Sequence, residues 1–274
     1  MRRAFLAGAL AAIALQMSAA EPNAEIREIP AEYVPAVNAA IDVGTQLFVH
    51  DVSAARASDE LVRRKIYGMD KRIRGWITDV DSGRSAIIVT FVGDVEGSPR
   101  GLHRVTVPME GVIEYEALKP AKPLEESAAA RWKARKLAIA DLEKRDDLCS
   151  SQYNTVVLPA EPARGEVIRV YMLAATSKPG VIVAGGHFRY EYSVDGEHLE
   201  SVRAFTKSCI EIPGPESEQG KPAGIMLTHM LDPTPTEIHV FLGRLHGQPV
   251  FLGTEAGIWA VQGREIYFVE PREK

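Results

Sequence analysis

Hydrophobic and polar residues alternate over much of this chain with the two-residue period of β-strands. In the first half, short runs of this kind predict strands at residues 46–49, 73–80, 85–92, 102–108 and 112–115. One short helix is expected at 58–67, with Ser58 as its N-cap and Gly68 after its last turn. The pattern therefore predicts a small β-rich module over residues 37–118.

The period changes after residue 118. Pro120 and Pro123 favour a linker, and the following stretch, 124–146, is rich in Ala, Leu, Glu, Lys and Arg, which predicts one long helix. The linker and the helix together occupy residues 119–148. Arg131 and Arg135 fall in or beside the apolar face of this helix, where arginines either pair with buried acids or extend their charged ends to water.

Strand patterns return in the second half, residues 149–274. They include a hairpin at Asp195-Gly196, a strand at 225–231, and a last series at 236–244, 249–254, 258–261 and 265–270, which predicts a β-meander. The fold class expected is β-rich (α+β). Two antiparallel β modules are joined by one long helix, and the C-terminal module ends in the meander.

The N-terminal residues have the pattern of a secretory signal peptide. A short basic start precedes an apolar run that ends in small residues, which predicts cleavage after Ala20 and an extended lead-in at 21–36. Arg2 and Arg3 leave twin-arginine export as an alternative. No later segment has the roughly 20 apolar residues of a transmembrane helix. The mature protein is therefore expected in the periplasm or secreted.

Charge and cysteine content narrow the class of function. The formal net charge is −5, and loss of Arg2 and Arg3 would make it −7, which argues against nucleic acid as a partner. The only cysteines, Cys149 and Cys209, are predicted to form a disulfide in an oxidising compartment.

A candidate ligand-facing surface lies on the strand predicted around residues 181–192. Because side chains alternate along a strand, His187, Arg189 and Glu191 share one face, opposite the aromatic residues between them. That polar face is either solvated or a binding surface.

A metal site is the sharper hypothesis for the histidines. In the strand expected at 236–244, Glu237 and His239 would point the same way, and His187 and His229 from neighbouring strands would complete a zinc site. The alternative is that these histidines are structural and bonded to nearby backbone or carboxylate groups. Apart from zinc at this site, the sequence predicts no cofactor.

Motifs for serine acyl transfer and for nucleotide binding are absent from the sequence. The chain resembles no characterised family. The leading hypothesis is a non-catalytic exported binding protein, or an interaction protein of the cell envelope, with a protein or small molecule as partner. The alternative is a metal-dependent hydrolase that uses the histidine and glutamate residues of the C-terminal module.

Overall fold

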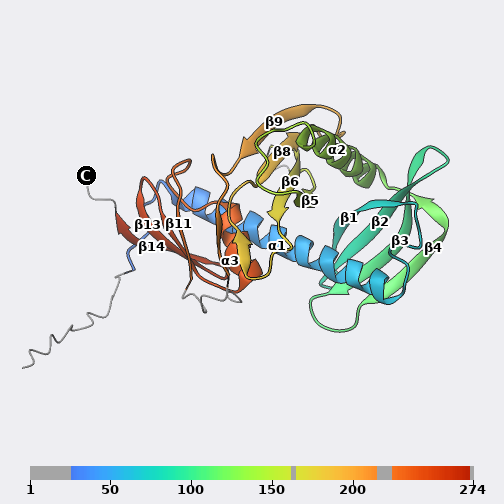
Figure 1. The fold of residues 1–274 in the computed structure, drawn as a ribbon, viewed down its shortest axis with the longest axis horizontal. Coiled ribbons are helices and arrows are strands. Elements are labelled where there is room, and N and C mark those ends of the chain that lie inside the picture. Colours follow the sequence, from blue (N-terminus) through green and yellow to red (C-terminus); the bar gives the residue numbers. More distant parts are fainter. Residues whose placement is uncertain (1–25, 162–164, 215–223, 272–274) are drawn as a thin grey trace, which may run out of the picture.

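The computed structural model describes residues 26–161, 165–214 and 224–271. The predicted signal peptide, with Ala20 and the twin arginines, lies outside these residues. A 30-residue helix, α1 (Val34–Arg63), crosses the molecule and contacts sheets along its whole length. In Figure 1 it runs from strands β11–β14 at one end, past β5–β9, to β1–β4 at the other.

The helix α1 replaces the strand at 46–49 and the short helix at 58–67 that the sequence predicted. Its buried residues recur every three or four positions, including Val37, Ala40, Leu47, Ala54 and Leu61, which is the spacing of a helix face. Ser58 is not an N-cap: its hydroxyl donates a hydrogen bond to the carbonyl of Ala54, one turn earlier. Residues 34–36, expected in the extended lead-in, form the first turn of α1.

The N-terminal sheet has the antiparallel order β1-β2-β3-β4. Its strands are β1 (Ile73–Asp81), β2 (Ala86–Val95), β3 (Ser98–Pro108) and β4 (Glu114–Pro123). The expected linker at 119–123 is part of β4. A strand at the edge of a sheet tolerates Pro120 and Pro123, because their missing N–H groups are not needed by a neighbour.

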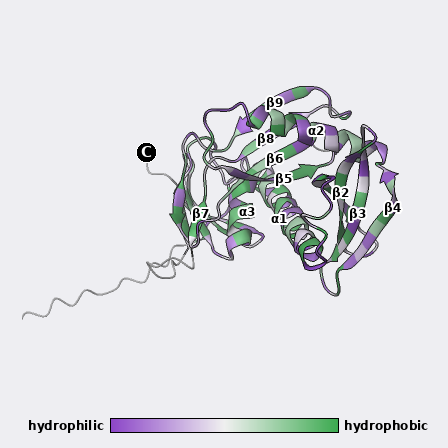
Figure 2. Ribbon diagram, turned by 45° about the vertical axis from the view of Figure 1, so that its right-hand side comes forward, coloured by the Kyte–Doolittle hydropathy of each residue, from purple (hydrophilic) through white to green (hydrophobic). Residues whose placement is uncertain are grey.

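The central sheet has the antiparallel order β5-β6-β8-β9. Its strands are β5 (Gln152–Leu158), β6 (Ile168–Ala175), β8 (Phe188–Tyr192) and β9 (Leu199–Ala204), beside the small pair β7 (Val181–Val183) and β10 (Glu211–Pro213). The predicted long helix is α2 (Glu126–Leu142), which packs on one face of this sheet. The other face packs against α1 and α3 (Glu237–His246). Figure 2 shows hydrophobic stretches on α1 and on the strands around it.

The C-terminal sheet has the order β11-β12-β13-β14 and corrects one expectation. Its strands are β11 (Ile225–Thr228), β12 (Val250–Gly253), β13 (Gly257–Gln262) and β14 (Glu265–Pro271). The strand expected at 236–244 is the helix α3, so β11 and β12 are joined by a helical crossover and run parallel. The meander of β12, β13 and β14 is confirmed as antiparallel. The described residues thus form a β-rich α+β fold of 14 strands and three helices.

At Gly44, α1 and α3 approach each other closely. A Cβ atom added there would lie 2.6 Å from the carbonyl oxygen of Glu237 and 2.6 Å from the Cβ of Val240. Such distances are well inside van der Waals contact, so only glycine fits this crossing without movement of α3.

The substitution Gly44→Ala is expected to lower the free energy of unfolding by about 2 kcal/mol, the usual cost of overpacking. Alanine is the better helix former by about 1 kcal/mol, so a helix without a tertiary contact would gain stability instead. Urea denaturation measures the difference. The control is Gly83→Ala in a turn, where the nearest atom to the new Cβ is 3.6 Å away. A Gly44→Ala protein as stable as the wild type would contradict the close crossing.

Candidate functional site

The polar face predicted on β8 exists, but it does not include His187. Phe188, Tyr190 and Tyr192 are buried, whereas Arg189 and Glu191 are partly exposed on the opposite face. His187 precedes the strand and is fully buried. Its Nδ1 accepts the Ala174 amide N–H at 3.0 Å, and its Nε2 donates to the carbonyl of Val183 at 3.2 Å. Both ring nitrogens are therefore occupied by backbone groups.

Helix α3 separates Glu237 from His239. In a strand these residues would point the same way, but two positions in a helix differ by about 200° around the axis. Thr236 is the N-cap of the helix: its hydroxyl accepts the backbone N–H of His239, while Nδ1 of His239 accepts the backbone N–H of Thr236. His239 is thus a capping residue with a structural role.

Glu237 points from the start of α3 toward the central sheet. Its Oε1 accepts hydrogen bonds from the Tyr171 hydroxyl on β6 at 3.0 Å and from Nη1 of Arg189 on β8 at 2.8 Å. Burial, and then the neighbouring Glu237 carboxylate, raise the pKa of Tyr171 well above its usual value. Tyr171 therefore remains a neutral hydrogen-bond donor at all ordinary pH values.

His229 and His239 are neighbours, with ring centroids 4.8 Å apart. Nε2 of His229 lies 2.7 Å from Oδ2 of Asp232, and the same carboxylate oxygen accepts a hydrogen bond from Arg203 on β9. Burial would raise the pKa of Asp232, but the bonds from His229 and Arg203 outweigh burial and lower it. Asp232 is therefore ionised at neutral pH.

The four residues of the metal hypothesis do not converge. His187 is bonded to backbone, Glu237 faces Tyr171 and Arg189, and only His229 and His239 are adjacent. Within the described residues, a metal-sized group of three such side chains occurs only at the exposed turn of Asp195, Glu197 and His198. The geometry therefore favours the structural alternative for these histidines.

A pocket of about 310 Å³ lies between α1 and the central sheet, and Glu237 and Asp232 are among the residues that line it. The side of α1 contributes small apolar residues, and the sheet contributes one cation from each of three strands. The lining residues used below are Ala36, Ala39, Arg169, Arg189, Arg203 and Glu237. We call this the α1 pocket.

Each of the three arginines at the α1 pocket forms an ion pair with a carboxylate. Arg169 lies 3.1 Å from Glu191, Arg189 pairs with Glu237, and Arg203 pairs with Asp232. In the register of the sheet, Arg169 is opposite Glu191 and Arg189 is opposite Arg203. Each guanidinium is held by a carboxylate, so the pocket presents both signs of charge on a fixed framework.

The sequence identified Arg189, Glu191 and Glu237 but not their partners. Arg169, Tyr171 and Arg203 were missed, although alternation on β6 and β9 places them on the same face as Arg189. The missing information was the pairing of the strands, because the order β6-β8-β9 is what brings the three arginines together.

In the part of the chain that the structure describes, no helix is long and apolar enough to cross a membrane. Comparison of the chain with protein-family models, with curated proteins and with solved structures finds no match.

Proposed function

We propose that this protein is a non-catalytic, exported binding protein that holds a small polar ligand in the α1 pocket. The observation that carries the proposal is the set of three arginines, from three adjacent strands, that face a cavity walled on the other side by alanines of α1. Binding sites for small molecules are concave, mostly apolar and contain a few fixed polar groups. The α1 pocket has these properties.

The charge pattern indicates the class of ligand. Arginine guanidinium groups recognise carboxylates through paired hydrogen bonds, and the carboxylates of Glu237 and Asp232 are suited to an ammonium group. A volume of about 310 Å³ is at the lower end of the range of ligand pockets. A small zwitterion, such as an amino acid or a dipeptide, matches both the size and the two signs of charge.

Export is supported by two features of the chain. The first 20 residues have the pattern of a signal peptide, and Cys149 and Cys209 form a disulfide, which is typical of oxidising compartments. A periplasmic or secreted binding protein fits both. The metal-dependent hydrolase has no comparable support, since its expected ligands do not meet.

The substitution Ala39→Phe tests the pocket directly. Ala39 is an exposed residue of α1 at the pocket wall, so phenylalanine fills the cavity without entering the core. Titration calorimetry of the mature protein with glutamate, arginine, glycine and glycyl-glycine is expected to detect binding of at least one of them. Ala39→Phe is expected to weaken that binding at least tenfold, because a filled pocket excludes the ligand.

The matched control is Ala55→Phe, the same change at an exposed position of α1 that does not line the pocket. It lies 16 residues further on, which is about 24 Å along the helix. Binding should be unchanged in this variant. If none of the zwitterions binds, or if both variants bind like the wild type, the proposal is wrong.

A further inference from the structure

Two arginines one turn apart on α2 are buried, but only one of them has an acidic partner. Arg131 is 3% exposed, and its guanidinium donates to the Asp79 carboxylate and to the carbonyl of Thr78. Arg135 is 7% exposed, and its Nε donates to the hydroxyl of Thr155 at 2.9 Å. In the described part of the chain, no carboxylate lies within ion-pair distance of Arg135.

Aromatic rings take the place of the missing acid. The Cζ of Arg135 lies 5.4 Å from the ring centroid of Trp76 and 5.3 Å from that of Trp132. Such cation–π contacts only partly offset the loss of water around a buried guanidinium. Burial lowers the pKa of Arg135 to about 10, so the side chain still carries its charge at neutral pH. The fold thus retains a buried cation without a counter-ion.

The guanidinium of Arg135 lies against Gly75, where any larger residue would overlap it. A Cβ added at Gly75 would lie 2.6 Å from Nη1, 2.8 Å from Cζ and 2.8 Å from Nη2 of Arg135. Nearly equal distances to these three atoms place Gly75 over the flat face of the guanidinium rather than at its edge. With its face covered by Gly75, the group makes its hydrogen bonds through its edge, where the N–H groups point.

Arg135 and Gly75 line a second pocket, of about 370 Å³, between α2 and the segment that follows α1. Lys71 and Arg74 at its rim are exposed and add positive charge. Its one acidic lining residue, Asp70, already accepts two hydrogen bonds from the guanidinium of Arg72, one from the backbone N–H of Arg72 and one from His103. The lining therefore carries three cations against one carboxylate, which is already paired with Arg72, in a chain whose net charge is negative.

We propose that this second pocket is a binding site for an oxyanion, a carboxylate or a phosphate carried by a small molecule, with Arg135 as its counter-ion. The edge of a guanidinium binds two oxygens of such a group through parallel N–H···O bonds. Lys71 attracts the anion at the rim, and Tyr67 and Trp76 offer ring surfaces to the apolar part of the ligand. This site is separate from the α1 pocket, because the two share no residue.

Tryptophan fluorescence offers a direct test, because two of the chain's three tryptophans contact Arg135. The mature protein is titrated with acetate, cyclohexanecarboxylate or inorganic phosphate at constant ionic strength. At least one anion is expected to change the emission with a saturable curve. Cyclohexanecarboxylate binding more tightly than acetate identifies a carboxylate ligand with an apolar ring, and binding of phosphate alone identifies a phosphate ester.

Arg135→Gln is expected to weaken the anion affinity at least tenfold, because it removes the charge that the oxyanion contacts. Because Arg135 is buried, its replacement can disturb the fold. Lys71→Glu therefore provides a second test at an exposed position, where about a threefold loss of anion affinity is expected. The matched control is Arg84→Gln, an exposed arginine outside the pocket, which should bind like the wild type. No saturable binding to the wild type, or equal binding by Lys71→Glu and Arg84→Gln, would overturn the proposal.

Discussion

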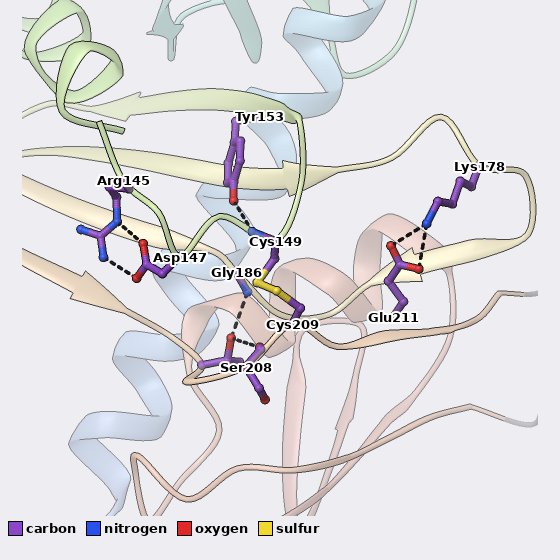
Figure 3. Close-up of a disulfide and its surroundings, with 10 residues drawn as sticks. Arg145, Asp147, Cys149, Tyr153, Lys178, Gly186, Ser208, Cys209 and Glu211 are labelled. Carbon is purple, nitrogen blue, oxygen red and sulfur yellow. Dashed lines mark hydrogen bonds and ion pairs between the residues drawn. A yellow bond between two sulfur atoms is a disulfide. The ribbon is translucent and has the colours of Figure 1, made fainter. Parts of the chain in front are cut away.

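Replacement of both Cys149 and Cys209 by alanine is expected to lower the free energy of unfolding by about 4 kcal/mol. The disulfide closes a loop with a sequence separation of 60, and a cross-link of that length removes much of the conformational freedom of the unfolded chain. It ties the segment after α2 to the segment between β9 and β10 (Figure 3). All four strands of the central sheet lie between the two cysteines in the sequence. Urea denaturation of the mature protein measures the loss.

Reduction provides the control for this experiment. Dithiothreitol should destabilise the wild type by a similar amount and leave the double variant unchanged, since the described residues contain no other cysteine. Alanine keeps the Cβ of Cys149, which packs against Gly186, where an added Cβ would lie 2.3 Å away. A loss below about 1 kcal/mol would show that the bond does not restrict the unfolded chain as the loop-closure argument requires.

The sequence predicted the elements whose signal is local. The first three strands of the N-terminal sheet, α2 and the final meander all have periodicity or turn residues within a short window. The disulfide followed from the presence of two cysteines in a chain with the pattern of an exported protein, and the structure confirms it.

The two predicted strands that are helical in the structure share one physical cause. Residues 46–49 and 236–244 are short apolar runs rich in β-branched and aromatic residues, and such runs fit either a strand or a buried helix. In α1 the deciding signal was that buried positions recur every three or four residues from Val37 to Leu61, which is the spacing of a helix and not of a strand. In α3 it was the ends, because Thr236 caps the start and Gly247 takes the left-handed conformation after the last turn.

The error in α3 had consequences for the site. Alternation in a strand put Glu237 and His239 on one face, and that placement was the basis of the metal hypothesis. In the helix the two side chains point in different directions, and the Glu237 carboxylate accepts hydrogen bonds from Arg189 and Tyr171. Neither the arginine pairs of the α1 pocket nor the position of Arg135 over Gly75 follows from local sequence, because both depend on which strands and helices become neighbours.

Acidification from pH 7 to pH 4.5 is expected to destabilise the protein by several kcal/mol through its buried histidines. Burial lowers the pKa of His50 and His187 from 6.5 to about 4, and that of His239 to about 3. Below pH 6.5 these three histidines therefore bind protons in the unfolded chain but stay neutral in the folded chain until the pH is about 4. Their stabilising effect is complete above pH 6.5 and decreases as the pH falls toward 4, by about 3 kcal/mol at most for each histidine.

One buried carboxyl group opposes this trend. Burial raises the pKa of Asp51 from 3.8 to about 6, so the folded state takes up a proton there in the same pH window and gains stability on acidification. Asp51→Asn removes that contribution and should steepen the loss. His187→Gln should reduce the loss, whereas the exposed control His198→Gln should not. Urea denaturation at pH 7, 6, 5 and 4.5 measures these differences, and equal pH dependence in His187→Gln and the wild type would show that folding does not lower the pKa of His187.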